Sequence, residues 1–245
     1  MKDFKFNYLK KLIDKDKVTI VEIGSHWGQD TVRFVQKFKN VIIHSFEPNP
    51  VTVKINKSLI ESVMKRTKMV ILNKPLEYEE AKIFLYNFAI SDKNGYTDFH
   101  CTYREPRESD KKHTERNLVG NVNFHYDDFV KPYVIAADGS SLNKIKGNDL
   151  YKTIKVQTKT LDDWLSDVEL DHVDLMWIDV QGHEKNVIKG AKEALKKVDY
   201  VIMETGEQNN YENAMSQKET IQLMKTFSFK HIRNFGNDSL FGREK

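Results

Sequence analysis

The sequence predicts an α/β fold in which a mostly parallel sheet is covered by helices on both faces. Short β-branched runs alternate with amphipathic segments along most of the 245 residues. This alternation is typical of parallel strands joined by crossover helices. The closing residues 227–241 contain two apolar runs around a Gly-Asn-Asp-Ser turn, which predicts an antiparallel edge.

The composition is that of a globular protein, and it argues against a disulfide-rich protein, a membrane-spanning protein and a nucleic-acid-binding protein. Hydrophobic residues make up 39% of the chain, which is enough for a core of ordinary size. Basic and acidic residues are nearly balanced, and the resulting net charge of +3 is too small to indicate a nucleic-acid or membrane partner. Cys101 is the only cysteine, so no intrachain disulfide can form. Without a signal-peptide pattern or an apolar run of about 18 residues, we expect a soluble cytoplasmic protein.

The first half of the chain holds three predicted strands. The run 18–23 is continuously β-branched, as expected for a strand buried on both faces. Asn94-Gly95 follows the third run and predicts a hairpin turn. The predicted strands are 18–23, 41–46 and 82–90, and the predicted helices are 4–13, 29–38 and 51–66.

Residues 100–150 interrupt the alternation. Their first part is highly charged, and their second part has no clear periodicity. Insertions in α/β folds often shape the substrate site. We therefore expect one domain over residues 1–245, with 100–150 as an inserted loop or cap over the acceptor site.

The alternation resumes after the insertion. Thr160 precedes Asp163 by three residues and predicts the start of a short helix, and Ser216 with Glu219 predicts a second capped helix. The predicted strands here are 154–158, 173–180 and 198–205, and the predicted helices are 160–167, 183–197 and one opening at Ser216.

The end of the first strand carries the first candidate site. Ligands of such sheets bind outside the carboxyl ends of the strands. Gly24 and Gly28 permit a tight turn with close approach of a ligand, but their spacing is not that of the dinucleotide fingerprint. Glu22 would repel a pyrophosphate and attract a cationic sulfonium or ammonium group. This turn therefore favours S-adenosylmethionine over NAD.

The end of the second strand supports a nucleoside ligand. Glu47 follows Gly28 by 19 residues, at the end of the run 41–46. A carboxylate at this place can accept hydrogen bonds from both ribose hydroxyls.

Six segments, taken together and in order, resemble the FkbM-type S-adenosylmethionine-dependent methyltransferases from about residue 18 to 242. They are VEIGSHWGQDT, FEPNP, FAISDKNGYTDF, GSSL followed by VQTKTLDDWL, VDLMWIDVQGHEKNVIKGA, and NDSLF. The resemblance implies a class I methyltransferase (Rossmann-like) sheet of seven strands. It also implies an O-methyltransferase that acts on a hydroxyl of a sugar or related small molecule or glycan. The cofactor residues that it implies are Glu22, Gly24, Gly28, Thr31 and Glu47, with Ala89 and Ser91 near the adenine.

Three positions depart from the family pattern. His26 stands where the family usually has Asn, and it remains among the cofactor-binding candidates. Trp177 replaces a usual Lys. Gln181 replaces a usual Glu, and an amide cannot act as a general base.

Methyl transfer to a hydroxyl needs an aligned acceptor and a base for its proton. Asp179, at the end of the strand 173–180, can face both cofactor and acceptor. His183 has a pKa range that suits a base near neutral pH, and Glu204 ends the next strand on the same rim. These three residues are the catalytic candidates. A divalent metal held by all three is an alternative that their spacing does not require.

Other functions stay open from the sequence. One is an NAD-dependent oxidoreductase, against which the glycine spacing and Glu22 argue. Another is a non-catalytic binding protein that keeps the fold, which Gln181 leaves possible. A nucleic-acid methyltransferase is disfavoured because the basic runs are short and mixed with acids.

Overall fold

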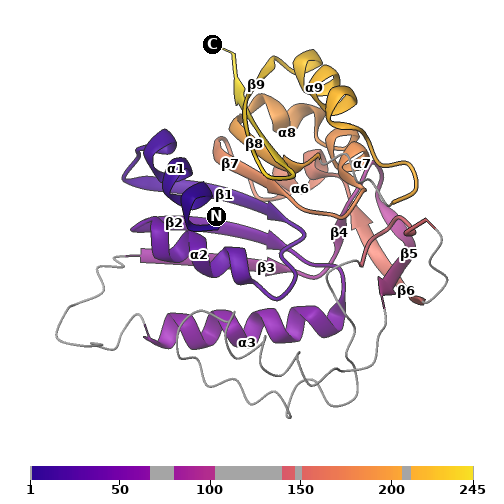
Figure 1. Ribbon diagram of the computed structural model, residues 1–245. Coiled ribbons are helices and arrows are strands. Elements are labelled where there is room, and N and C mark those ends of the chain that lie inside the picture. The colour runs from indigo at the N-terminus through magenta and orange to yellow at the C-terminus, as the bar shows by residue number, and fades with distance from the viewer. Residues whose placement is uncertain (1, 67–79, 103–139, 147–150, 206–210, 245) are drawn as a thin grey trace.

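A seven-stranded sheet forms the centre of the protein (Figure 1), whose computed structural model describes residues 2–66, 80–102, 140–146, 151–205 and 211–244. The strand order is β3-β2-β1-β7-β8-β10-β9. Neighbouring strands are parallel from β3 to β8, and β10 runs antiparallel to β8 and β9. The predicted fold class is confirmed. The strands are β1 (Lys17–Ile23), β2 (Asn40–Phe46), β3 (Glu80–Tyr86), β7 (Val173–Ile178), β8 (Val198–Glu204), β9 (Phe229–Phe235) and β10 (Asp238–Arg243).

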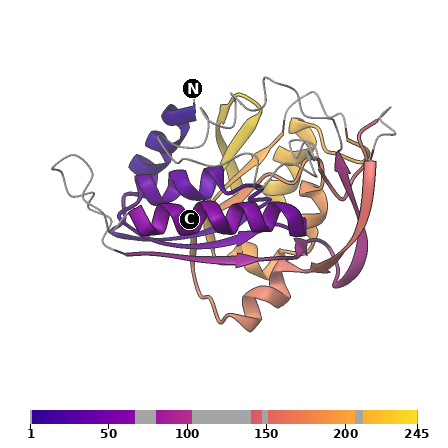
Figure 2. The same ribbon diagram turned by 90° about the horizontal axis from the view of Figure 1, so that it is seen from below.

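Helices cover both faces of this sheet (Figure 2). In β1, Val18 and Ile20 belong to the core under the first helices, and Val21 and Ile23 to the core on the opposite face. This strand is therefore buried on both sides, as its continuous β-branched run predicts. One face carries α1 (Lys2–Ile13), α2 (Gln29–Lys37) and α3 (Pro50–Arg66), and the other carries α6 (Leu161–Asp167), α7 (Glu184–Lys189), α8 (Lys192–Lys196) and α9 (Gln217–Thr226).

Both predicted helix caps are present. The Thr160 side chain accepts a hydrogen bond from the Asp163 N–H, at 3.1 Å, and opens α6. Ser216 and Glu219 form a reciprocal capping box at the start of α9. Each cap satisfies backbone donors that have no partner inside the helix.

The predicted strand 82–90 is in fact two strands. β3 ends at Tyr86, and the chain then leaves the main sheet. Ala89–Ile90 form β4, which belongs to a second sheet with the order β4-β6-β5. Apolar residues stand on both sides of this break, so their pattern does not show where the chain changes sheets.

The second sheet also corrects two other expectations. β6 (Tyr151–Lys159) was expected in the main alternation, but it pairs with β4 and with β5 (Gly95–Thr102). Asn94-Gly95 is not the turn of a β-hairpin. It lies between β4 and β5, which do not pair with each other because β6 lies between them. Figure 1 shows this sheet beyond the carboxyl ends of β1, β2 and β3.

The predicted helix 183–197 is broken into α7 and α8 at Gly190 and Ala191. A β-carbon at Gly190 would lie 2.0 Å from the carbonyl oxygen of Ser91, so the backbones touch here. Asp162 of α6 accepts hydrogen bonds from the Glu193 and Ala194 N–H groups and caps α8. The break therefore ties this layer of helices to the second sheet.

Most of the expected insertion, 103–139 and 147–150, lies outside the described residues. The assignment of 100–150 as a cap on a single domain stays a prediction. Among the helices that the structure describes, none is long and apolar enough to span a bilayer.

Candidate functional site

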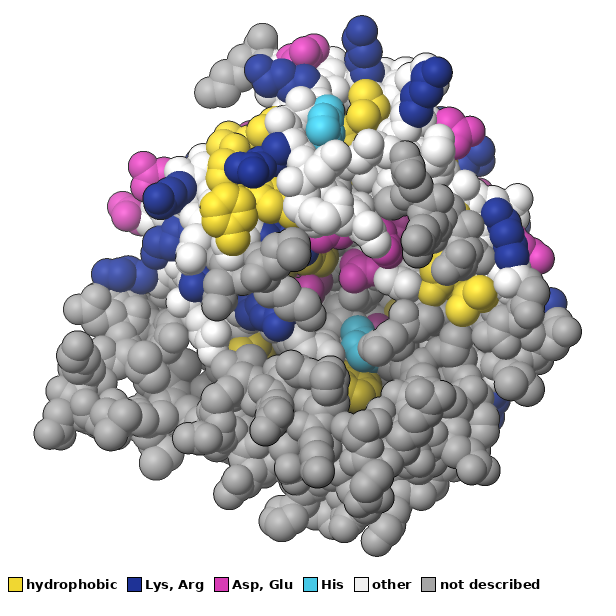
Figure 3. All heavy atoms as spheres, viewed as in Figure 1, with side chains coloured by type: hydrophobic (Ala, Val, Ile, Leu, Met, Phe, Trp, Pro, Cys, Tyr) yellow, Lys and Arg dark blue, Asp and Glu magenta, His cyan; other side chains and the backbone are white. Residues whose placement is uncertain are grey.

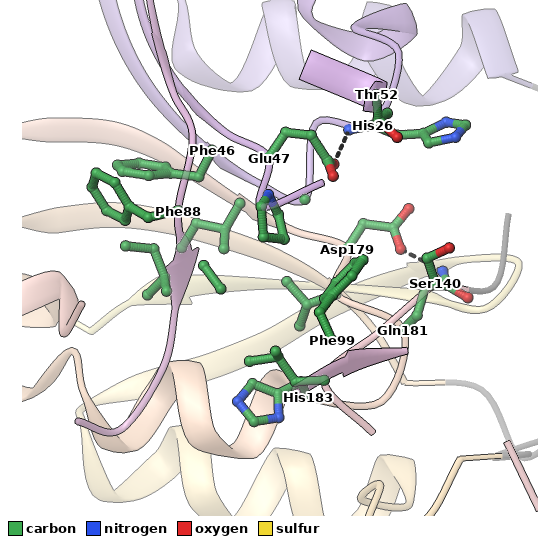
Figure 4. Close-up of a pocket in the computed structure, with 17 residues that line it drawn as sticks. His26, Phe46, Glu47, Thr52, Phe88, Phe99, Ser140, Asp179, Gln181 and His183 are labelled. Atoms are coloured by element: carbon green, nitrogen blue, oxygen red, sulfur yellow. Dashed lines mark hydrogen bonds between the residues drawn. The ribbon is translucent and has the colours of Figure 1, made fainter. Parts of the chain in front are cut away.

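A pocket of about 240 Å³ lies where β1, β2 and β7 end. This is many times the roughly 15 Å³ that one water molecule needs, so a small-molecule ligand fits. Among the predicted site residues, it brings together Gly24, His26, Glu47, Ala89, Asp179 and His183 (Figure 4). Figure 3 shows acidic side chains around a hollow near the middle of the face seen in Figure 1.

The turn after β1 is shaped by its glycines. Gly24 and Gly28 have φ angles of 90° and 86°, a region that side chains rarely adopt. The Asn56 side chain holds this turn from α3 by donating to Ser25 Oγ at 2.8 Å and to the His26 carbonyl at 3.1 Å. Gly24 lines the pocket, whereas Gly28 lies behind it as the residue before α2.

Glu47 presents an oriented carboxylate. Its Oε2 accepts the His26 N–H and its Oε1 accepts the Asn49 N–H, both at 2.9 Å. Burial raises the pKa of Glu47 to about 7. A carboxylate has about four acceptor sites, so each oxygen can accept one further hydrogen bond. Two neighbouring hydroxyls of a ribose would match this capacity.

Apolar side chains form one wall of the pocket. Phe46 and Phe88 lie together, with ring centroids 5.4 Å apart, and Figure 4 shows them on one side of Glu47. Ala89 and Ile90 of β4 and Phe99 of β5 also line the pocket. Such a surface suits a flat aromatic ring such as adenine. The three phenylalanines carry no motif in the sequence and were not predicted, although Phe46 and Phe88 directly precede the predicted residues Glu47 and Ala89.

The side-chain amide of Gln181 forms hydrogen bonds to both Asp179 and Glu204. Gln181 Nε2 donates to Asp179 Oδ1 at 2.6 Å and to Glu204 Oε2 at 3.1 Å. Burial, with the nearby Glu204 charge, raises the pKa of Asp179 to about 7. Among the described residues, no group donates to the other oxygen of Asp179, Oδ2. Asp179 lines the pocket, so a ligand group can reach a carboxyl group that titrates near neutral pH.

His183 lines the pocket but is held at both ring nitrogens. Nε2 lies 3.0 Å from Ser91 Oγ, and Nδ1 lies 3.0 Å from Asn143 Oδ1. Burial lowers the pKa of His183 to about 4. This setting differs from that of a base tuned near neutral pH, because burial penalises the charged form of the imidazole.

Glu22 does not line the pocket. Its side chain is buried behind the turn and accepts hydrogen bonds from Thr31 Oγ1 and Ser45 Oγ, each at 2.5 Å. Burial raises the pKa of Glu22 to about 8. Glu22 and Thr31 thus form one buried cluster, and the expected direct attraction of Glu22 to a cationic ligand is not what this geometry provides.

The other candidates lie around the pocket without lining it. Ser91 bonds to His183 from β4's carboxyl end, and Glu204 reaches the pocket only through Gln181. The three-residue metal site that we considered is not assembled, because His183 is bonded to Ser91 and Asn143 and the Gln181 amide occupies the space between the two acids. In the described part of the chain, the group with metal-ligand spacing is His172, Asp174 and Asp199, and Lys15 already bonds to all three.

Residues 22–237 match the methyltransferase FkbM domain. The chain belongs to the FkbM methyltransferase family. A curated relative is the 2-O-methyltransferase NoeI of Sinorhizobium fredii, which is 30% identical over 216 residues, or 88% of this chain and 74% of that protein. The protein is therefore an S-adenosylmethionine-dependent methyltransferase.

A solved methyltransferase structure has a fold similar to that of this FkbM methyltransferase. The small RNA methyltransferase HEN1 superposes with a TM-score of 0.50 at 10% identity, over 99% of this chain and 26% of that one. The precorrin-6y C5,15-methyltransferase of Geobacter metallireducens has a TM-score of 0.46 at 7% identity, over 98% and 87% of the two chains. At such identities the likeness concerns the fold alone, which is the class I methyltransferase fold.

The three departures from the FkbM pattern now have structural settings. His26 contributes its backbone N–H to Glu47, and its ring stacks on Trp27 with centroids 4.8 Å apart. Trp177 is a buried core residue that packs against Phe6 and Phe34 beneath α1 and α2. Gln181 bridges two carboxyl groups at the pocket, where its two amide hydrogens serve as donors.

Proposed function

We propose that this chain transfers a methyl group from S-adenosylmethionine to a hydroxyl of a sugar or a related small molecule. The observation that carries the proposal is Asp179, a pocket carboxyl group with a pKa near 7 and an oxygen to which no described residue donates. A hydroxyl acceptor must lose a proton during transfer, and such a group can take it. The name of the relative, a 2-O-methyltransferase, supports oxygen as the methylated atom.

The cofactor would be held by residues of three strand ends. Glu47 would accept hydrogen bonds from the two ribose hydroxyls, and Phe46, Phe88 and Ala89 would contact the adenine. Gly24 would allow the cofactor to lie close to the backbone. When bound, S-adenosylmethionine supplies an electrophilic methyl group on a sulfonium that leaves readily.

Asp179 would act on the acceptor. Its Oδ2 would accept the hydroxyl proton as the acceptor oxygen forms its bond to the methyl carbon, and the carbon–sulfur bond breaks in the same step. The proton thus ends on the carboxyl group and leaves to solvent before the next turnover. Glu204 does not line the pocket, so we assign it an electrostatic effect on Asp179 and no contact with the acceptor.

Calorimetry tests the cofactor half of the proposal. Purified protein is titrated with S-adenosylmethionine, S-adenosylhomocysteine and NAD, and Glu47→Ala serves as the site variant. We expect both sulfur ligands to bind, NAD not to bind, and the variant to lose binding. If neither sulfur ligand binds the wild-type chain, the assigned cofactor site is wrong.

Labelled methyl transfer tests the acceptor half. The wild type and Asp179→Asn are incubated with methyl-labelled S-adenosylmethionine and a panel of monosaccharides and oligosaccharides. We expect label on a hydroxyl with the wild type and a rate lower by about 10²- to 10⁴-fold with the variant, whose amide cannot take a proton. Equal rates, with S-adenosylhomocysteine affinity unchanged, would exclude Asp179 as the base.

A further inference from the structure

Gln181 makes three hydrogen bonds that use both ends of its amide. Nε2 donates to Asp179 Oδ1 at 2.6 Å and to Glu204 Oε2 at 3.1 Å, and Oε1 accepts the Tyr211 hydroxyl at 2.8 Å. These partners come from the ends of β7 and β8 and from residue 211. The amide therefore lies at the junction of three segments, one of which carries the proposed base.

The orientation of this amide is determined by its partners. Reversing it would place Oε1 against two carboxyl oxygens, where no hydrogen bond is possible when both acids are ionised. The Tyr211 hydroxyl adds a donor that only Oε1 can accept in the observed orientation.

The backbone also places Gln181. Its φ angle is 54°, and Gly182 follows with a φ angle of 92°. A β-carbon on Gly182 would lie 2.4 Å from Tyr211 Cβ, so this turn packs directly on Tyr211. Glycine adopts such a φ angle readily, whereas for Gln181 the conformation is sparsely populated, a feature that is frequent at functional sites, where surrounding contacts maintain it.

We propose that Gln181 is the positioning residue of Asp179: its amide holds the Asp179 carboxylate in the pocket wall and keeps it ionised beside Glu204, and Tyr211 fixes the amide orientation. This inference rests on the proposed role of Asp179 as the base. Without a shared donor, two neighbouring acids favour a state in which one of them is protonated. A protonated Asp179 cannot take the acceptor's proton, so the amide maintains the form that the reaction needs.

The charges that face Asp179 make this donor important. Burial, Glu204, Asp238 and Asp30 all raise the pKa of Asp179, and the hydrogen bond from Gln181 lowers it. Asp238 pairs with Glu204 across β8 and β10 and is bound by Lys5 of α1 at 2.5 Å. Glu184 of α7 lies in the same region, and burial raises its pKa to about 8. The nearby charges that act on Asp179 are therefore acidic, and Gln181 opposes their effect.

The titration of Asp179 itself tests the inference. The carboxyl carbons of aspartate are labelled with ¹³C, the Asp179 signal is identified by its loss in Asp179→Asn, and its midpoint is measured by NMR. The test variant is Gln181→Met, which keeps the length of the side chain and removes both donors. The matched control is Gln157→Met, which changes an exposed glutamine on β6.

We expect the Asp179 midpoint to rise by about one pH unit or more in Gln181→Met and to stay unchanged in Gln157→Met. Tyr211→Phe keeps the ring that packs on Gly182 and should raise the midpoint by a smaller amount. An unchanged midpoint in both Gln181→Met and Tyr211→Phe would overturn the inference. If Gln181→Met fails to fold, Tyr211→Phe decides alone, with an unchanged midpoint counting against the inference.

Two further readouts separate positioning from a general structural effect. The pH profile of transfer should move to higher pH in Gln181→Met, with the rate restored above the new midpoint. S-adenosylhomocysteine affinity, measured by calorimetry at high pH, should change little. The titration needs neither acceptor nor turnover. A wild type that fails to bind S-adenosylhomocysteine would therefore defeat the proposed function and leave the titration result standing.

Discussion

The backbone of Gly24 touches the carbonyl group of Asp179, and a β-carbon at position 24 would lie 1.9 Å from that oxygen. The Asp179 N–H also donates to the Ile23 carbonyl at 2.9 Å. These contacts extend the pairing of β1 and β7 to the edge of the pocket. The glycine turn therefore positions the proposed base as well as leaving space for a cofactor.

Gly24→Ala is expected to disrupt both the fold and the site. The substitution adds a clash with backbone to a φ angle of 90°, so we expect a loss of about 3 kcal/mol or more in the free energy of unfolding. Binding of S-adenosylhomocysteine should be lost as the turn moves. Thermal denaturation and calorimetry measure the two effects.

Gly236→Ala is the matched control. Its φ angle of 64° imposes a similar backbone penalty, but nothing lies within 4 Å of the added carbon. We expect a loss of about 1 kcal/mol and normal ligand binding. Equal losses in the two variants would show that backbone strain, and not contact with Asp179, explains the effect at position 24.

Glu47→Gln tests whether the Glu47 carboxylate recognises the ribose. The amide oxygen keeps one acceptor, so affinity for S-adenosylhomocysteine at pH 8 should fall about 10- to 100-fold. Because the pKa of Glu47 is raised to about 7, wild-type affinity should fall about tenfold between pH 8 and pH 6 as the carboxylate is protonated. Calorimetry across this range should show that the variant lacks this decline. The same decline in both proteins would assign it to another group.

Glu22→Gln tests the buried cluster behind the turn. Burial raises the pKa of Glu22 to about 8, above its ordinary value of 4.5. Between these values the folded state binds more protons at Glu22 than the unfolded state does, so the contribution of Glu22 to stability is fully present below about pH 4.5 and is lost as the pH rises through about 8. The variant cannot ionise, so its free energy of unfolding should decline less over this range, as urea denaturation would measure. An identical pH dependence in both proteins would contradict the assigned pKa.

The sequence predicted the main sheet well because its signals are local. The β-branched run 18–23 and the two helix caps each depend on neighbouring residues. The change of sheet between β3 and β4 is marked in the sequence by a single polar residue, Asn87, within the otherwise apolar stretch from Ile83 to Ile90, which is too little to predict it. The break at Gly190 depends on contact with Ser91, which is distant in sequence.

The residues of the site, like the elements of the fold, could be predicted in part. Acids at strand ends could be selected from topology alone, and Glu47 and Asp179 do line the pocket. The direction in which each side chain points could not be predicted, and Glu22 points away from the pocket to Thr31 and Ser45. The extent of burial could not be predicted either, and it lowers the pKa of His183. Tyr211 was missed because it follows no strand and has no motif, although it contacts Gln181.

His183→Gln is expected to affect stability much more than methyl transfer. The imidazole bonds to Ser91 and Asn143, and its pKa of about 4 leaves it neutral at physiological pH. We expect a loss of about 1–3 kcal/mol in the free energy of unfolding and a rate within about tenfold of wild type, in contrast to Asp179→Asn.

The free energy of unfolding of His183→Gln should also decrease less than that of the wild type as the pH falls. The unfolded state takes up a proton at His183 near pH 6.5, whereas the folded state resists protonation to about pH 4. The His183 contribution is therefore lost as the pH falls through this range, and the glutamine cannot show that loss. Urea denaturation between pH 7 and pH 4 measures the difference. If His183→Gln is folded and binds S-adenosylhomocysteine normally but transfers no methyl group, the prediction is wrong and His183 takes part in methyl transfer, because a purely structural imidazole would leave the reacting groups intact.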